Sequence, residues 1–262
     1  MNSNSATNSD SQIINKLPQI TAAFWIMKIT ATTLGETGGD WLSMTMNLGY
    51  LTSTLIFFGL FVVALGTQLV SQKHYPYLYW TVIVATSTAG TTMSDYMDRT
   101  LGLGYTKGAA ILVTILFSLL LMWKFTVGNV QVNDIRTRKA EVFYWITILF
   151  SNTLGTALGD FLADDSGLGF FGSWLLITGI LGVILALTFF TRINKVFLFW
   201  IAFILTRPFG ATFGDVLTKT REKGGLDFGR GYSSLILLAI LLVTILISYR
   251  NKEDRLTAVP AD

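Results

Sequence analysis

Four short acidic motifs recur in this sequence of 262 residues, and each ends in an aspartate. The motifs read GETGGD, GTTMSD, GTALGD and GATFGD, and their aspartates are Asp40, Asp95, Asp160 and Asp215. Three further acids, Glu36, Asp98 and Asp164, lie three or four residues from a motif aspartate, so a helix would put both carboxylates on one face. Carboxylates beside threonine and backbone oxygens suit protons or hard cations such as Mg²⁺, Mn²⁺ or Ca²⁺. These acids are therefore candidate ligands for a small cation.

A column of polar residues lies eight positions before the motif aspartates. It consists of Thr32, Ser87, Asn152 and Arg207. The flanking residues are apolar, so the column is predicted to line the interior, with Asn152 and Arg207 as further candidate binding residues. A buried arginine needs a carboxylate partner, and Asp160 or Asp95 are the nearest candidates by residue type.

Two lysines break the fourfold pattern. Lys219 follows Asp215 by four residues and would neutralise its charge, so the predicted site is not symmetric. Lys28 has no counterpart in the other repeats. We expect its long side chain to reach the cytoplasmic membrane interface.

The same motifs also have a structural interpretation. Each carries small residues four positions apart, which let two helices approach closely. These pairs are Gly35 and Gly39, Gly90 and Ser94, Gly155 and Gly159, and Gly210 and Gly214. A tryptophan precedes each aspartate by fifteen residues, about 22 Å along a helix. Trp25, Trp80, Trp145 and Trp200 are therefore predicted to mark one membrane interface, and the aspartates could be solvated helix ends near the other.

Several other kinds of site are excluded. The sequence has no cysteine and one histidine, which rules out thiolate chemistry, disulfides and multi-histidine metal centres. It contains no nucleotide-binding, serine-hydrolase or metalloprotease motif. We therefore predict no enzymatic activity, no catalytic residue and no cofactor beyond a bound divalent cation. Intramembrane hydrolysis by paired aspartates is an alternative, but no pair stands out from the four equivalent motifs.

The composition is typical of a membrane protein, because 52% of the residues are apolar and only 13% are charged. Uniformly apolar segments at about 49–70, 107–127, 168–190 and 231–249 alternate with a second kind that becomes rich in Gly, Thr and acids. This second kind covers about 20–43, 77–98, 141–163 and 196–218. Each uniformly apolar segment is long enough to cross a hydrocarbon core of about 30 Å, and four segments of each kind make eight spans. The sequence predicts an all-α membrane protein with eight transmembrane helices.

Lysine and arginine are distributed unevenly between the two sides of this arrangement. Eleven lie on the side of the termini and six on the other, which predicts that both termini are cytoplasmic in a bacterial inner membrane. Residues 1–18 are predicted to be a disordered tail without a signal peptide, and residues 251–262 a second tail. The basic balance of the chain, a net charge of +3, is therefore mostly a signal of orientation. The bilayer is therefore the expected partner, nucleic acid is not, and the oligomeric state is left open.

The motifs belong to four tandem repeats, predicted at about 20–73, 74–127, 140–193 and 194–250 within a membrane domain of residues 19–250. The chain resembles a family of bacterial integral membrane proteins of unknown function that have four such repeats, each with two spans and a characteristic tryptophan. An even number of spans makes successive repeats enter the membrane in the same direction. We therefore expect four parallel helical hairpins with pseudo-symmetry about the membrane normal.

Two functions agree with these features. The first is secondary transport or passive permeation of a small solute, with a divalent metal ion or a proton as the favoured cargo. The alternative is a scaffold or sensor that transports nothing, in which the Gly and Asp motifs serve packing and helix capping. A cavity that reaches past Asp95 and Asp160 would favour transport, whereas an axis filled by side chains would favour the scaffold.

Overall fold

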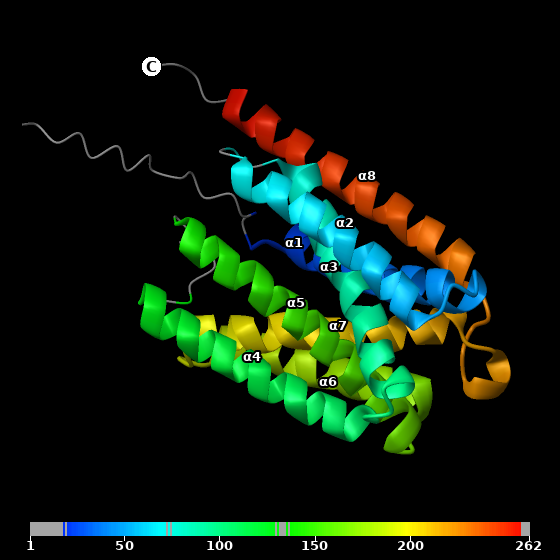
Figure 1. Ribbon diagram of the computed structural model, residues 1–262. Helices are drawn as coiled ribbons and strands as arrows, with labels where there is room; N and C mark the ends of the chain where they lie inside the picture. The colour runs from blue at the N-terminus through cyan, green and yellow to red at the C-terminus, as the bar shows by residue number, and fades with distance from the viewer. Residues whose placement is uncertain are drawn as a thin grey trace, which may run out of the picture.

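The computed structural model describes Pro18 and residues 20–257, apart from residues 72, 74, 129, 131–134 and 136. All regular elements in this part are helices, which confirms the predicted all-α class (Figure 1). The α-helices are α1 (Ala22–Asp40), α2 (Tyr50–Val70), α3 (Pro76–Asp95), α4 (Tyr105–Val127), α5 (Arg138–Asp160), α6 (Gly169–Phe190), α7 (Lys195–Thr218) and α8 (Arg230–Thr257). Helix α8 continues beyond the predicted span end at residue 250. The predicted N-terminal tail lies outside the described residues, except for Pro18.

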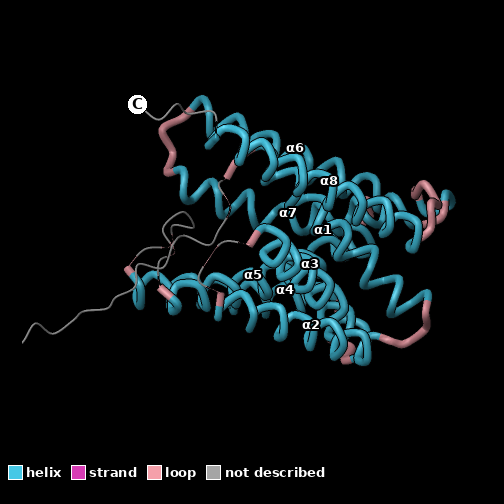
Figure 2. The backbone as a smooth tube through the Cα atoms, turned by 90° about the horizontal axis from the view of Figure 1, so that it is seen from above, coloured by secondary structure: helices cyan, strands magenta, loops and turns pink. Residues whose placement is uncertain are grey.

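The first helix of every repeat belongs to a closed inner ring. Helix α1 packs against α3, α3 against α5, α5 against α7, and α7 returns to α1. In Figure 2 these four helices lie between α6 and α8 on one side and α2 and α4 on the other. The threonine- and glycine-rich halves that distinguish these segments in the sequence are therefore gathered at the centre.

The second helix of every repeat packs on the inner helix of the following repeat. Helix α2 lies against α3, α4 against α5 and α6 against α7, while α8 closes the circle on α1. The outer helices leave large apolar side chains uncovered, such as Phe190 with 88% of its surface exposed. An apolar face of this kind is stable next to lipid.

Six of the eight helices are long and apolar enough to cross a membrane. They are α2, α4, α5 together with the turn after it, α6, α7, and α8 as far as Arg250. Helices α1 and α3 are not among them, because their second halves consist largely of threonine, glycine and acidic residues. The eight predicted helices are thus present, and apolarity alone identifies six of them as spans.

The four inner helices run in the same direction. At one end of the ring, Tyr79 beside Trp80 contacts Trp145, with ring centroids 5.5 Å apart. At the other end, Arg99 binds Asp160, and Lys219 approaches Asp40. Tryptophans therefore gather at one end of the bundle and motif aspartates at the other, as a parallel arrangement requires.

A short π-helical turn follows the motif aspartate in the first three repeats. These turns cover Trp41–Thr45, Tyr96–Thr100 and Phe161–Asp165. Each leads to a glycine with positive φ at the start of the outer helix, for example Gly49 with φ of 76°. Glycine accepts this conformation without the steric cost that a Cβ would add. The fourth repeat lacks the π-helical turn and has a longer connection that contains the 3₁₀ turn Arg221–Lys223.

Candidate functional site

The first glycine of each motif lies directly against the polar column of the next inner helix. Gly35 meets Ser87, Gly90 meets Asn152, Gly155 meets Arg207, and Gly210 meets Thr32. At Gly90 an added Cβ would lie 2.9 Å from the backbone nitrogen of Thr153, a distance at which the helices must separate. The two columns identified in the sequence are therefore the two halves of one repeated helix contact.

The second small residue of each motif makes looser contacts. A Cβ on Gly39, Gly159 or Gly214 would come 3.1 Å from a side-chain atom of the neighbouring inner helix. Ser94, which occupies this position in the second repeat, donates a hydrogen bond to Asp98 at 3.3 Å. Close packing in this structure depends mainly on the first glycine of the pair.

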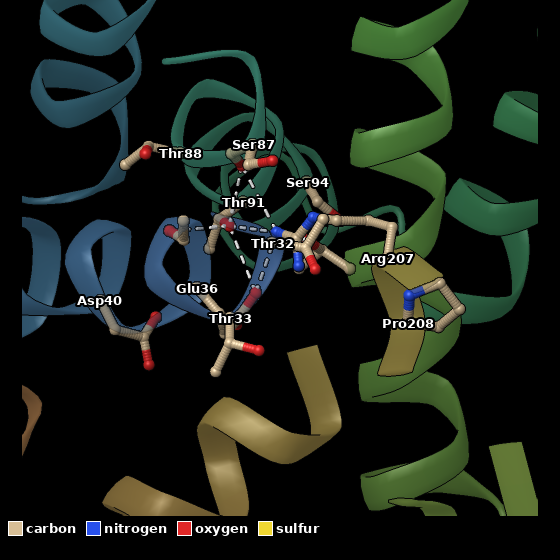
Figure 3. A network of polar contacts seen from close by, with 12 residues as sticks. Thr32, Thr33, Glu36, Asp40, Ser87, Thr88, Thr91, Ser94, Arg207 and Pro208 are labelled. Carbon is tan, nitrogen blue, oxygen red and sulfur yellow. Dashed lines mark hydrogen bonds and ion pairs between the residues drawn. The ribbon is translucent and has the colours of Figure 1, made fainter. Parts of the chain in front are cut away.

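Arg207 reaches across the axis of the ring and contacts the other three inner helices (Figure 3). Its Nη2 donates to Glu36 Oε2 at 3.0 Å, to Thr156 Oγ1 at 2.7 Å, and to the Thr91 hydroxyl. Glu36, Thr91 and Thr156 each lie four residues before a motif aspartate, so they occupy one level of the ring. At this level the axis is filled by the guanidinium group and its partners.

The carboxylate partner of Arg207 differs from the predicted one. Arg207 forms an ion pair with Glu36, and both side chains are buried. The predicted partners Asp160 and Asp95 bind Arg99 instead. The difference arises because residues four positions before the motif aspartates face Arg207, whereas the aspartates themselves lie about one turn further along the axis.

The other members of the polar column are also buried, and two of them form hydrogen bonds between helices. The Thr32 hydroxyl donates to the backbone oxygen of Thr206 at 3.2 Å, and the Asn152 amide donates to the Thr86 hydroxyl at 3.0 Å. The predicted interior position of the column thus agrees with the structure. Each member also lies in close contact with the first motif glycine of a neighbouring inner helix.

The motif aspartates form a buried layer that is joined by basic side chains. Arg99 connects two of them, with Nε 3.0 Å from Asp95 and Nη2 3.2 Å from Asp160. Lys219 connects the other two, since its Nζ lies 3.1 Å from Asp215 and 4.0 Å from Asp40. We refer to these four aspartates with Arg99, Lys219 and Arg230 as the aspartate layer.

Arg230, at the start of α8, completes this layer. Its Nε lies 3.3 Å from Asp40 Oδ2. Arg99 was identifiable in the sequence, because it follows Asp95 by the same four residues that separate Lys219 from Asp215. The sequence contains no such signal for Arg230, since its contact with Asp40 depends on how α8 packs against α1.

Lys219, which follows the last residue of α7, remains a charged member of the layer. Burial disfavours the ammonium form, but the nearby Asp215 and Asp40 carboxylates outweigh this effect and raise the pKa of Lys219 above that of a free lysine. The side chain is therefore a fixed positive charge at neutral pH. This agrees with the expectation that Lys219 offsets the charge of Asp215.

Two of the predicted acids lie apart from the aspartate layer. Asp98 is buried against Gly108 of α4 and accepts a hydrogen bond from Ser94. Asp164 is exposed and accepts a hydrogen bond from the Tyr105 hydroxyl at 3.2 Å. The spacing placed them near the motif aspartates in sequence, but the π-helical turn changes the direction of their side chains relative to a regular helix.

The described residues contain one group of three carboxylates with the separation of metal ligands. Oxygens of Glu36, Asp40 and Asp215 all lie within 4.8 Å of one another. Basic groups already bind each of them, because Glu36 pairs with Arg207 and Lys219 lies between the two aspartates. The oxygen ligands suit a hard cation, but the Lys219 ammonium already lies next to two of the three carboxylates.

Lys28 is buried on α1, although the sequence predicts that it reaches the membrane interface. Its Nζ lies 4.0 Å from the centre of the Phe203 ring and has no hydrogen-bond partner among the described residues. A cation over an aromatic face gains electrostatic attraction from the ring. The interface prediction was wrong because Lys28 faces the inside of the ring, next to α7.

The tryptophan end of the ring is closed by aromatic side chains. Trp80 and Trp145 are buried, and the Tyr79 and Tyr144 hydroxyls share a hydrogen bond of 2.7 Å. Trp200 is also buried and donates to the Val130 carbonyl at 2.9 Å. These three tryptophans pack in the core of the bundle and do not contact its surroundings, which differs from the predicted role of interface anchors. Trp25 is partly exposed beside Phe199.

Comparisons with known proteins agree with the repeat structure. No curated protein and no solved structure matches the chain. One family model, described as a repeat of unknown function (DUF347), matches residues 23–74, 78–129, 143–194 and 198–254. These matches confirm the four tandem repeats, and each contains most of one inner helix and all or most of one outer helix. Because they cover most of the sequence, the chain belongs to the DUF347 repeat family.

Proposed function

We propose that this protein is an eight-span membrane protein that passes a small cation, either a proton or a divalent metal ion, along the axis of its inner ring. The observation that carries the proposal is the amount of charge buried on this axis. Ionisable residues inside a membrane are costly and usually belong to ion or proton pathways. In the described structure, the axis holds charged groups at three levels.

The three levels form an ordered series from one end to the other. Lys28 lies over the Phe203 ring towards the tryptophan end, Arg207 and Glu36 follow, and the aspartate layer comes last. Five buried carboxylates occupy the second and third levels, namely Glu36, Asp40, Asp95, Asp160 and Asp215. The basic groups facing them there are Arg99, Arg207, Lys219 and Arg230. Such a series offers a cation successive partners.

The arrangement corresponds to a closed state of the proposed pathway. Arg207 fills the axis at one level, and Lys219 lies between carboxylates at the next. Passage of a cation therefore requires these side chains to leave their carboxylates. In this proposal the basic groups act as internal counter-ions that hold the pathway shut until a cargo cation replaces them.

A scaffold without transport is the second candidate, and the filled axis favours it. Arg207, the polar column and the first motif glycines interlock at the centre of the ring. The ion pairs would then specify which helices meet. Buried ion pairs serve such specificity in some proteins. The transport proposal predicts that ions cross a membrane that contains only this protein, and the scaffold predicts that they do not.

Neutralising one motif aspartate separates the candidates. Asp160→Asn keeps the side-chain shape but removes the charge that faces Arg99. We expect proton or Mn²⁺ flux into proteoliposomes to fall about tenfold or more, which corresponds to a barrier increase of about 1.4 kcal/mol. Flux is measured with dyes sensitive to pH and to Mn²⁺ enclosed in the vesicles.

The neighbouring acid provides a matched control for this experiment. Asp164→Asn makes the same chemical change four residues later, at an exposed position. We expect this variant to transport as the original chain does. If the original chain moves none of H⁺, Mg²⁺, Mn²⁺ and Ca²⁺, the scaffold becomes the favoured function. If both variants transport equally well, Asp160 does not take part in the pathway.

The proposed orientation has its own test. Eleven basic residues on the side of the termini against six on the other favour cytoplasmic termini in a bacterial inner membrane. We expect a reporter that requires the cytoplasm, fused after Asp262, to be active, and one that requires the periplasm to be inactive. The reverse pattern would invert the orientation. An odd number of spans would give termini on opposite sides of the membrane.

A further inference from the structure

A large apolar groove opens on the outside of the inner ring between three helices. Its walls are formed by residues 20–29, which include the start of α1, and by α6 between Thr178 and Phe189, and its floor by α7 between Lys195 and Thr206. The groove has a volume of about 1010 Å³. Most of its lining is apolar, so water would bind poorly there, and a hydrocarbon chain matches its chemistry.

The groove has the length of one leaflet of a bilayer. From Lys195 to Thr206, α7 advances about 16 Å at 1.5 Å per residue. This is half of the hydrocarbon core, which is about 30 Å thick. An acyl chain that enters from the membrane surface beside Lys195 would therefore reach the middle of the membrane near Thr206.

The surface end of the groove is positively charged. Lys195 is exposed there and forms no ion pair with a described residue. Helices α1 and α7 both begin at this end, and neither has an acidic residue in its first turn. Helix N-termini carry partial positive charge, which adds to that of the lysine. An anionic headgroup would complement this end.

From these features we infer that the groove between α1, α6 and α7 is a binding site for one anionic phospholipid. Its acyl chains would lie along Ile29, Leu181 and Ala202, and its phosphate would bind Lys195. This site does not depend on the transport proposed above. A lipid held here would cover the contact between the first and last repeats, where no covalent connection joins the neighbouring inner helices α1 and α7.

Two pairs of variants test the site. Gly182→Phe places a large side chain in the groove, whereas Gly179→Phe places the same side chain on α6 outside it, and both positions are open to an added Cβ. Lys195→Gln removes the headgroup contact. Its control is Lys139→Gln, which removes another exposed lysine, from the first turn of α5. Lys195 is exposed, so Lys195→Gln is expected to leave the fold intact and keeps the test valid even if a bulky variant fails to fold.

Binding is measured on the purified full chain by native mass spectrometry and by thermal unfolding, with added dioleoyl phosphatidylglycerol or phosphatidylcholine. We expect the original chain to retain one phosphatidylglycerol in preference to phosphatidylcholine, and Gly179→Phe and Lys139→Gln to behave alike. Gly182→Phe should lose the bound lipid. Lys195→Gln should lower the preference for the anionic lipid about fivefold, as expected for one basic residue worth about 1 kcal/mol near an anionic headgroup.

Three results would overturn the inference. Equal binding of both lipids by the original chain would mean that the groove takes ordinary bilayer lipid. Unchanged lipid binding by Gly182→Phe would place the bound lipid elsewhere. A dimer of the original chain that Gly182→Phe converts to a monomer would identify a second copy of the chain as the occupant.

Discussion

Gly90→Leu is expected to prevent folding of the protein. The backbone of α5 lies so close to Gly90 that even a Cβ would stand 2.9 Å from the nitrogen of Thr153 and 3.0 Å from the carbonyl carbon of Asn152. Backbone atoms cannot move aside without separating the two helices. The cost should therefore exceed the ~1–3 kcal/mol that is typical of overpacked cores.

The measurement is the yield of monodisperse protein in detergent and its melting temperature. Gly59→Leu is the matched control, because Gly59 lies within α2 and has open space around it. Gly159→Leu should lie between these two, since its nearest neighbour is the Ala211 side chain at 3.1 Å. If Gly90→Leu has the same yield and melting temperature as the original chain, the inner helices are not in close contact at this level.

Arg207→Met is expected to destabilise the protein by about 3–5 kcal/mol, the range observed when one partner of a buried ion pair is removed. Methionine keeps an unbranched stem next to Gly155 but leaves Glu36 buried without its counter-ion. Thr156 also loses the hydrogen bond that it accepts from the guanidinium group. The loss is measured as a lower melting temperature in detergent.

A second substitution tests whether the unpaired charge causes this loss. In Arg207→Met combined with Glu36→Leu, no charge remains at this level, and most of the stability should return, because apolar residues often replace buried ion pairs without loss. Arg221→Met is the control at an exposed arginine and should be neutral. If the double variant is less stable than Arg207→Met alone, Glu36 has a stabilising role that does not depend on Arg207.

The outcomes for these buried groups distinguish a pathway from a scaffold. If the protein is a scaffold, the double variant should be stable and should keep its structural role. In the proposed pathway, it should be stable but should no longer transport, because two of the charged groups on the axis are missing. Comparison of melting temperature with flux in proteoliposomes therefore separates the two interpretations.

The local pattern of the sequence was enough to predict the repeats and the helices. Residue types recur at fixed offsets around Trp25, Trp80, Trp145 and Trp200, and each repeat has the same alternation of a polar and an apolar helix. The order of elements follows from such periodicity, since hydrogen bonding within a helix and the length of an apolar run depend on neighbouring residues alone. The interior position of Thr32, Ser87, Asn152 and Arg207 followed from the same reasoning.

Tertiary structure decided which side chains meet. Glu36 rather than Asp160 binds Arg207, and Arg230 reaches Asp40 from a helix that is distant in the sequence. Lys28 lies inside the ring although its position near a helix start suggested the interface. These contacts depend on the register between helices and on closure of the ring from α7 to α1. Spacing along a single helix carries no information about register between helices, and so the sequence alone could name the charged groups but could not pair them.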